Sequence, residues 1–128
     1  MKKDEVIKYW IESAERDMKT MIHLYEKKDF HWSLFLGHLV IEKFLKALYV
    51  KKKSEQPPYI HNLLRIADKA EITFTEEQLD ILTTITSFNI EARYDDYKSV
   101  FYRKCTFEYT TIWIDNIKEI AEWIKEKL

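Results

Sequence analysis

Apolar residues recur at helical spacing along most of the chain. From Ile7 to Tyr25 they follow one another at intervals that suit an amphipathic helix with one buried face. The stretch after Asp29 carries apolar residues on more than one stripe, so a single neighbour cannot cover it. We therefore predict a helix over residues 4–27 and a second over residues 30–53, which should lie at the centre of the fold.

Boundary signals divide the second half of the chain. Lys51-Lys52-Lys53 favours a helix C-terminus through the macrodipole, and Pro57-Pro58 forbids continuation of that helix. Thr75 followed by Gln78 has the form of a capping box, which predicts a helix start. The further predicted elements are a short helix over residues 61–67, a helix from residue 76 to about residue 88, a connector over residues 93–104 and a last helix over residues 105–127.

The composition agrees with an all-helical class. One Gly and two Pro among 128 residues leave little turn chemistry for tight hairpins, while a hydrophobic content of 46% can form a core. A chain of this length is typical of one domain. The sequence therefore predicts a single all-α domain over residues 1–128, an up-and-down bundle of four to five helices.

Charge and cysteine content narrow the possible functions. With 21 basic and 22 acidic side chains the net charge is −1, so no global field attracts nucleic acid or an anionic membrane, and any anion site must be local. The single cysteine, Cys105, excludes an internal disulfide and a thiolate zinc site. No stretch resembles a signal peptide or a membrane span. We expect a cytoplasmic protein with no membrane, metal or cofactor.

Polar residues interrupt the apolar second helix at His38, Glu42, Lys43 and Lys46. Glu42 and Lys46 are one turn apart, so they can form an ordinary intrahelical pair worth about 0.2–0.5 kcal/mol. Alternatively Glu42, Lys43 and Lys46 line a groove, in which lysine attracts phosphate and glutamate orients a basic partner. His38 and Glu42 have the spacing of a metal-binding pair, but no second such pair is present, which favours a hydrogen-bonded core histidine.

A second polar cluster, Arg93, Asp95, Asp96 and Tyr97, occupies the predicted connector. Ion pairing within it can fix a turn, but so many polar groups together favour a ligand site. His61 lies near the start of the short helix, where it either caps backbone donors or faces a ligand. The candidate ligand-binding residues are Arg93, Asp96, Tyr97, Glu42, Lys43, Lys46 and His61.

Three segments share the order and spacing of one known family. The block from His38 to Leu48 is similar to Gln-Ala-Ala-Glu-Lys-x-Leu-Lys-Ala, Arg93-Tyr94-Asp95-Asp96 is similar to Arg-Tyr-Pro-Asp, and Pro58 precedes His61 at a fitting distance. Together they resemble the HEPN family of small helical-bundle proteins. The resemblance implies a homodimer that binds a nucleotide or RNA phosphate and acts with a separately encoded minimal nucleotidyltransferase, in a toxin–antitoxin-like system.

The chain departs from the ribonuclease members of that family. These resemble one another in carrying a histidine four to six residues after an arginine, and two such pairs meet across a dimer interface. No histidine follows Arg93, since the last histidine of the chain is His61. Without that proton-transfer group we predict little or no ribonuclease activity of this type and assign no catalytic residue. Two alternatives stay open: an endoribonuclease that uses Arg93 with another base, such as His61, Tyr97 or Lys98, and a purely structural dimerisation bundle.

Overall fold

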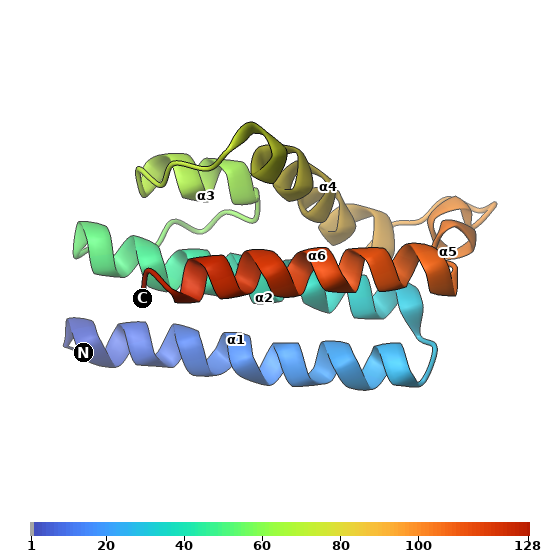
Figure 1. The fold of residues 1–128 in the computed structure, drawn as a ribbon, viewed down its shortest axis with the longest axis horizontal. Coiled ribbons are helices and arrows are strands. Elements are labelled where there is room, and N and C mark those ends of the chain that lie inside the picture. The colour runs from blue at the N-terminus through green and yellow to red at the C-terminus, as the bar shows by residue number, and fades with distance from the viewer. Residues whose placement is uncertain (1) are drawn as a thin grey trace.

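The computed structural model describes residues 2–128, and within them it contains helices and no strand. The helices are α1 (Lys3–Glu26), α2 (Phe30–Lys53), α3 (Leu63–Lys69), α4 (Glu76–Arg93), α5 (Val100–Lys104) and α6 (Phe107–Lys125) (Figure 1). The all-α prediction is confirmed, although these six helices exceed the four to five expected. Over residues 2–128, no helix is long and apolar enough to cross a membrane.

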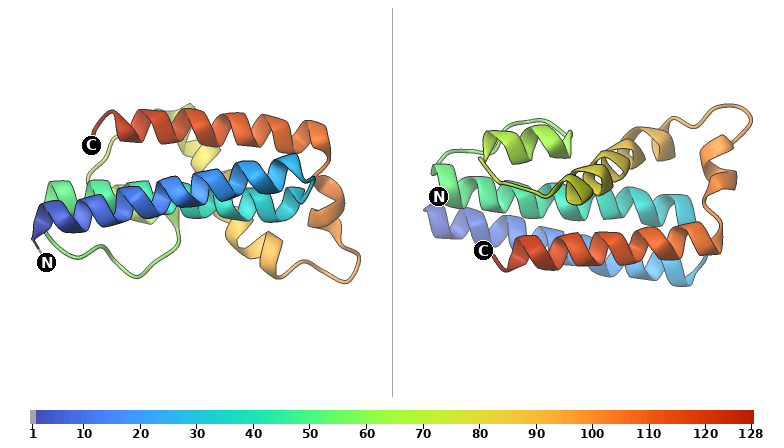
Figure 2. Two further views of the ribbon diagram at one scale, coloured as in Figure 1. Left: turned by 90° about the horizontal axis from the view of Figure 1, so that it is seen from below. Right: turned by 45° about the horizontal axis from the view of Figure 1, so that its top comes forward.

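α2 is the central helix of the bundle. It contacts each of the other helices, because apolar residues cover almost its whole circumference. α1, α2 and α6 run along the length of the molecule, α3 and α4 lie together on one side of α2, and α5 closes one end (Figures 1 and 2). The prediction that the second helix is central is therefore confirmed.

Gly37 allows α2 and α6 to pack closely. A Cβ atom at this position would collide with Ile117 of α6 and would lie 3.2 Å from the Met21 sulfur of α1. Glycine is thus required here by the close approach of three helices, although it is a poor helix former. The contact fixes the position of α6 beside the middle of α2.

The predicted capping box is present at the start of α4. The Thr75 hydroxyl oxygen accepts a hydrogen bond from the Gln78 backbone N–H at 3.1 Å, and the Gln78 side-chain oxygen accepts one from the Thr75 N–H at 2.9 Å. Two otherwise unpaired donors are satisfied in this way. The predicted start of this helix is confirmed.

α5 is the helix that the sequence pattern did not predict. The connector folds back on Asp95, whose carboxylate accepts hydrogen bonds from the backbone N–H groups of Asp96, Phe101 and Tyr102 at 2.8–3.1 Å. A helix this short has no detectable apolar period, and its anchor lies outside it in the sequence. The last helix consequently begins at Phe107 and not at Cys105 as predicted, with Thr106 as its N-cap.

Candidate functional site

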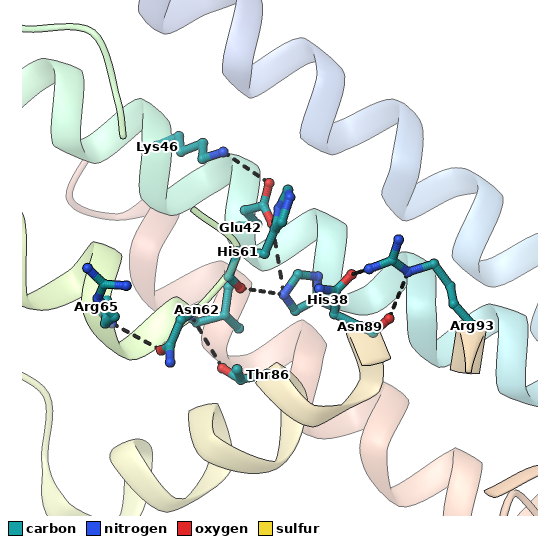
Figure 3. Close-up of polar contacts among 10 residues, drawn as sticks. His38, Glu42, Lys46, His61, Asn62, Arg65, Thr86, Asn89 and Arg93 are labelled. Atoms are coloured by element: carbon teal, nitrogen blue, oxygen red, sulfur yellow. Dashed lines mark hydrogen bonds and ion pairs between the residues drawn. The ribbon is translucent and has the colours of Figure 1, made fainter. Parts of the chain in front are cut away.

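Glu42 is the centre of a buried polar network on α2 (Figure 3). Glu42 and Lys46 are 4% and 5% exposed, and the Lys46 ammonium donates to Glu42 Oε2 at 3.1 Å. The second carboxylate oxygen, Oε1, accepts a hydrogen bond from His61 Nδ1 at 2.8 Å. A buried charge is costly unless it is paired and hydrogen-bonded. The intrahelical pair of the first interpretation is therefore formed, but it is buried and is joined by a third group from the segment before α3.

His38 also binds the segment before α3, through the backbone of His61. Its Nε2 lies 2.8 Å from the His61 backbone carbonyl, which can only accept, so Nε2 carries the proton and donates. Burial lowers the pKa of His38, and the His61 carbonyl and the Glu42 carboxylate oppose this shift only in part. His38 is thus a neutral, fully buried residue. The prediction of a hydrogen-bonded core histidine is confirmed.

His61 presents one ring nitrogen to the surface. Because Glu42 binds Nδ1–H, the neutral ring carries its lone pair on Nε2, and the side chain is 61% exposed. An imidazole oriented in this way can accept a proton or bind a donor on a ligand. It does not cap α3, since the Asn62 side chain accepts from the Arg65 N–H at the start of that helix.

Arg93 lies at the end of α4 with its guanidinium anchored and exposed. Nε donates to the Asn89 carbonyl at 2.9 Å and Nη2 donates to the Asn89 side-chain oxygen at 3.1 Å. Its Cζ lies 5.6 Å from the ring centroid of Phe35 on α2 and 5.0 Å from that of Tyr94. Within residues 2–128 no carboxylate forms an ion pair with Arg93. The positive charge is therefore held in place and left uncompensated.

The other candidate residues lie apart from the Glu42 network. Lys43 pairs with Asp17 of α1 at 2.6 Å. The Asp96 carboxylate accepts from the backbone N–H groups of Lys98 and of Val100, the first residue of α5, and the Tyr97 side chain is almost fully exposed. Lys43 and Asp96 are thus engaged with groups outside the Glu42 network. The candidate residues that the structure brings into contact are Glu42, Lys46 and His61.

Arg93 and the Glu42 network lie along one side of α2, with His38 between them (Figure 3). Arg93 stacks on Phe35, and His61 is bonded to Glu42. Phe35 and Glu42 are seven residues apart, which corresponds to roughly 10 Å along a helix axis. The arginine and the exposed histidine are neighbours on one face, but they do not form a contact pair.

Two residues that shape the Arg93 site were not among the candidates. Asn89 precedes Arg93 by one helical turn, so their spacing could have indicated the hydrogen bonds. Phe35 gave no such signal, because it comes from α2 and its stacking on Arg93 depends on the packing of two helices. Sequence patterns reveal contacts within a helix more readily than contacts between helices.

Comparisons with known proteins agree with this fold. The HEPN domain family matches residues 7–128. Among solved structures, TT1696 from Thermus thermophilus aligns with a TM-score of 0.82 and 20% identity, over 95% of this chain and 98% of that one. ST0689, an archaeal HEPN homologue, aligns with a TM-score of 0.74 and 20% identity, over 94% and 96% of the two chains. No curated protein sequence matches significantly. At this identity the structural likeness shows the fold, and the family match shows that the chain belongs to the HEPN family.

Proposed function

We propose that this protein is a homodimeric module that binds the phosphate of a nucleotide or of RNA through Arg93. The observation that carries the proposal is the state of its guanidinium, which is exposed, anchored by Asn89 and free of any carboxylate partner among residues 2–128. A guanidinium fork matches phosphate oxygens well. Because Asn89 already restrains it, less side-chain entropy is lost on binding.

Aromatic residues that contact Arg93 or follow it in the connector support a nucleotide or RNA ligand in preference to phosphate alone. Tyr94 stacks on Arg93, and Tyr97 and Tyr102 of the connector expose their rings. Bases stack on such rings without strong sequence preference. Lys98 lies over the Tyr97 ring and adds positive charge. We infer that a single-stranded segment would place its phosphate on Arg93 and a base on these tyrosines.

An exposed apolar patch beside Arg93 supports the dimer. Ile90, Tyr94 and Val100 expose apolar surface and line a hollow of about 260 Å³ between α4 and α5. Exposed apolar groups gathered in this way are typical of protein interfaces. A two-fold interface here would bring two Arg93 residues, one from each protomer, near each other.

The binding proposal is tested by anisotropy titrations with fluorescently labelled single-stranded RNA and with labelled ATP. Arg93→Ala should weaken binding about tenfold. The slope of the logarithm of the binding constant against the logarithm of salt concentration should also fall by about one phosphate contact. Arg65→Ala is the matched control, because Arg65 is also exposed and forms no ion pair within residues 2–128. Equal losses in both variants, or no binding to either probe, would contradict the proposal.

An endoribonuclease is the second candidate, because the Glu42-bound His61 could act as a base. It ranks lower, since no histidine follows Arg93 at the family spacing and no hydrogen bond joins Arg93 to His61 within residues 2–128. We expect purified protein to leave RNA intact. Robust cleavage that is lost in both Arg93→Ala and His61→Ala would reverse this ranking.

The proposal of a nucleotidyltransferase partner rests on the family alone. Many small HEPN proteins are paired with a minimal nucleotidyltransferase in toxin–antitoxin-like units, and we propose such a partner for this chain. Co-expression with a short nucleotidyltransferase encoded beside it should yield a complex on affinity purification. Expression of the protein alone should then slow growth, and the partner should restore it. Failure to co-purify would remove this part and leave the Arg93 proposal standing.

A further inference from the structure

A separate pocket lies toward the other end of α2 from Arg93. The start of α1, the end of α2 and the segment over residues 54–59 enclose a volume of about 550 Å³. Small-molecule sites commonly have volumes of about 300–1,000 Å³. The pocket is therefore large enough for a ring system with one substituent group.

A buried lysine contributes to the lining of this pocket. Lys46 is 5% exposed, and its ammonium lies 5.5 Å from the Trp10 ring centroid. It donates one hydrogen bond, to Glu42, within the part of the chain that the structure describes. An ammonium has three N–H donors, so two remain for a ligand. Glu42 already compensates the charge of Lys46, so Lys46 offers the ligand hydrogen-bond donors, which suit the oxygen atoms of an anionic group.

Apolar and aromatic side chains form much of the remaining lining. They include Trp10 of α1, and Pro57, Pro58 and the 91%-exposed Tyr59 of the segment after α2. Lys3 lies at the rim and forms no ion pair within residues 2–128. Rings of this kind stack on planar ligands.

Glu55 is the lining residue least suited to an anion. Its Oε2 accepts a hydrogen bond from the Tyr49 hydroxyl at 3.0 Å, so this carboxylate already has a donor. Lys46 supplies N–H donors, and Lys3 at the rim supplies a positive charge without an ion pair within residues 2–128, so both suit an anionic group on the ligand.

We propose that this pocket binds a small planar ring that carries one anionic group. The ring would stack on Trp10 and be covered by Tyr59, and the anion would contact Lys46 and Lys3. The exposed position of Tyr59 leaves it free to close over the ring. The site shares no residue with the Arg93 site, so it stands or falls independently of the proposed function.

Calorimetric titrations with four probes test the proposal. AMP and indole-3-acetate each combine a ring with an anion, whereas adenosine lacks the anion and inorganic phosphate lacks the ring. At least one of the first two should bind saturably, and about tenfold more tightly than adenosine or phosphate. Preference for AMP would identify a phosphate ligand, and preference for indole-3-acetate a carboxylate. Binding of neither, or equal binding of adenosine, would overturn the proposal.

Two exposed substitutions test the location without disturbing the core. Tyr59→Ala and Lys3→Gln should each weaken binding about threefold or more, because they remove stacking and charge. Tyr59→Phe, which keeps the ring, and Lys8→Gln, on an exposed side chain outside the pocket, should leave it unchanged.

The Arg93→Ala variant separates the two proposals. If it leaves binding of AMP or indole-3-acetate intact while weakening RNA binding about tenfold, both proposals are supported. If instead Arg93→Ala loses binding of AMP or indole-3-acetate while Tyr59→Ala and Lys3→Gln bind them normally, the pocket proposal is contradicted. The Arg93 proposal is then still supported.

Discussion

At the scale of single residues, Glu42 compensates a buried cation that has no other carboxylate partner among residues 2–128. Glu42→Ala leaves the Lys46 ammonium buried and unpaired and also releases His61. We expect the free energy of unfolding to fall by about 3–5 kcal/mol, as measured by urea denaturation. Glu12→Ala, in the exposed Lys8–Glu12 pair, should cost less than about 1 kcal/mol.

A double variant separates charge from packing. Glu42→Leu combined with Lys46→Met replaces the pair by apolar groups of similar volume and should recover most of the lost stability. If Glu42→Ala costs no more than Glu12→Ala, the buried pair does not stabilise the fold.

His38 should make stability depend on pH. Burial lowers the pKa of folded His38 below its usual value of 6.5. As the pH falls through 6.5, His38 of the unfolded chain takes up a proton that His38 of the folded protein does not, so unfolding becomes more favourable. The free energy of unfolding should therefore decrease between pH 7 and pH 5. In the His38→Gln variant the same free energy should decrease less steeply with pH.

His31 must be compared in the same experiment. Burial also lowers its pKa, against the opposing charges of Asp29 and Asp95. A His31→Gln variant therefore reports its share of the pH dependence. An unchanged pH slope in His38→Gln would show that His38 is charged in the folded protein or exposed.

Some contacts of single residues could be predicted from the sequence, and others could not. The Glu42–Lys46 pair was predicted because its spacing is local. The burial of this pair and its bond to His61 were not predicted, because they depend on how the segment before α3 lies across α2. Asp96 was assigned to a ligand site, yet its carboxylate binds backbone donors of its own connector.

At the scale of helices, the contact between α2 and α6 depends on Gly37. Gly37→Ala places a methyl group against Ile117 and Met21. Overpacking of this kind costs about 1–3 kcal/mol, while alanine returns about 0.5–1 kcal/mol of helix propensity. We expect a net loss of about 1 kcal/mol in thermal or urea unfolding.

Ile117→Val provides the test of this explanation, because it removes the terminal methyl that the new Cβ would meet first. Gly37→Ala should cost less in the Ile117→Val background than in the wild type, and a double-mutant cycle measures the difference. Equal costs in both backgrounds would show that the loss arises elsewhere.

Helix boundaries were predictable where each depends on neighbouring residues. The capping box at Thr75 and the basic end of α2 before Pro57 both mark boundaries in the sequence, and the structure has them. α5 has no comparable signal, since its anchor Asp95 lies outside the helix and reaches forward to Phe101 and Tyr102.

At the scale of the whole molecule, α2 separates two different surfaces. One end carries Arg93, exposed aromatic rings and the hollow between α4 and α5, which apolar and charged residues line together. The other end carries the pocket beside Trp10 and Lys46. The N-terminus lies at this end of the bundle, beside the end of α2 (Figure 2). The periodicity of the sequence predicted the central helix, but only the packing of α3, α4 and α5 against it determined which polar residues meet.

The surface at the Arg93 end makes a prediction about assembly. Light scattering at micromolar concentration should give the mass of a dimer. Ile90→Glu places a charge among the exposed apolar residues next to Arg93 and should shift the protein toward monomer. Ile112→Glu is the matched control, because Ile112 of α6 is 58% exposed against 54% for Ile90 and does not line that hollow.

The two isoleucine variants also locate the interface. If Ile90→Glu dissociates the dimer and weakens RNA binding together with it, each Arg93 depends on its counterpart in the second protomer, as expected for a site built across a two-fold axis. If Ile90→Glu is monomeric but binds RNA with full affinity, one Arg93 suffices and the dimer serves another purpose. A dimer that resists Ile90→Glu and yields to Ile112→Glu would place the interface on α6, and a monomeric wild-type protein would remove the homodimer from the proposed function.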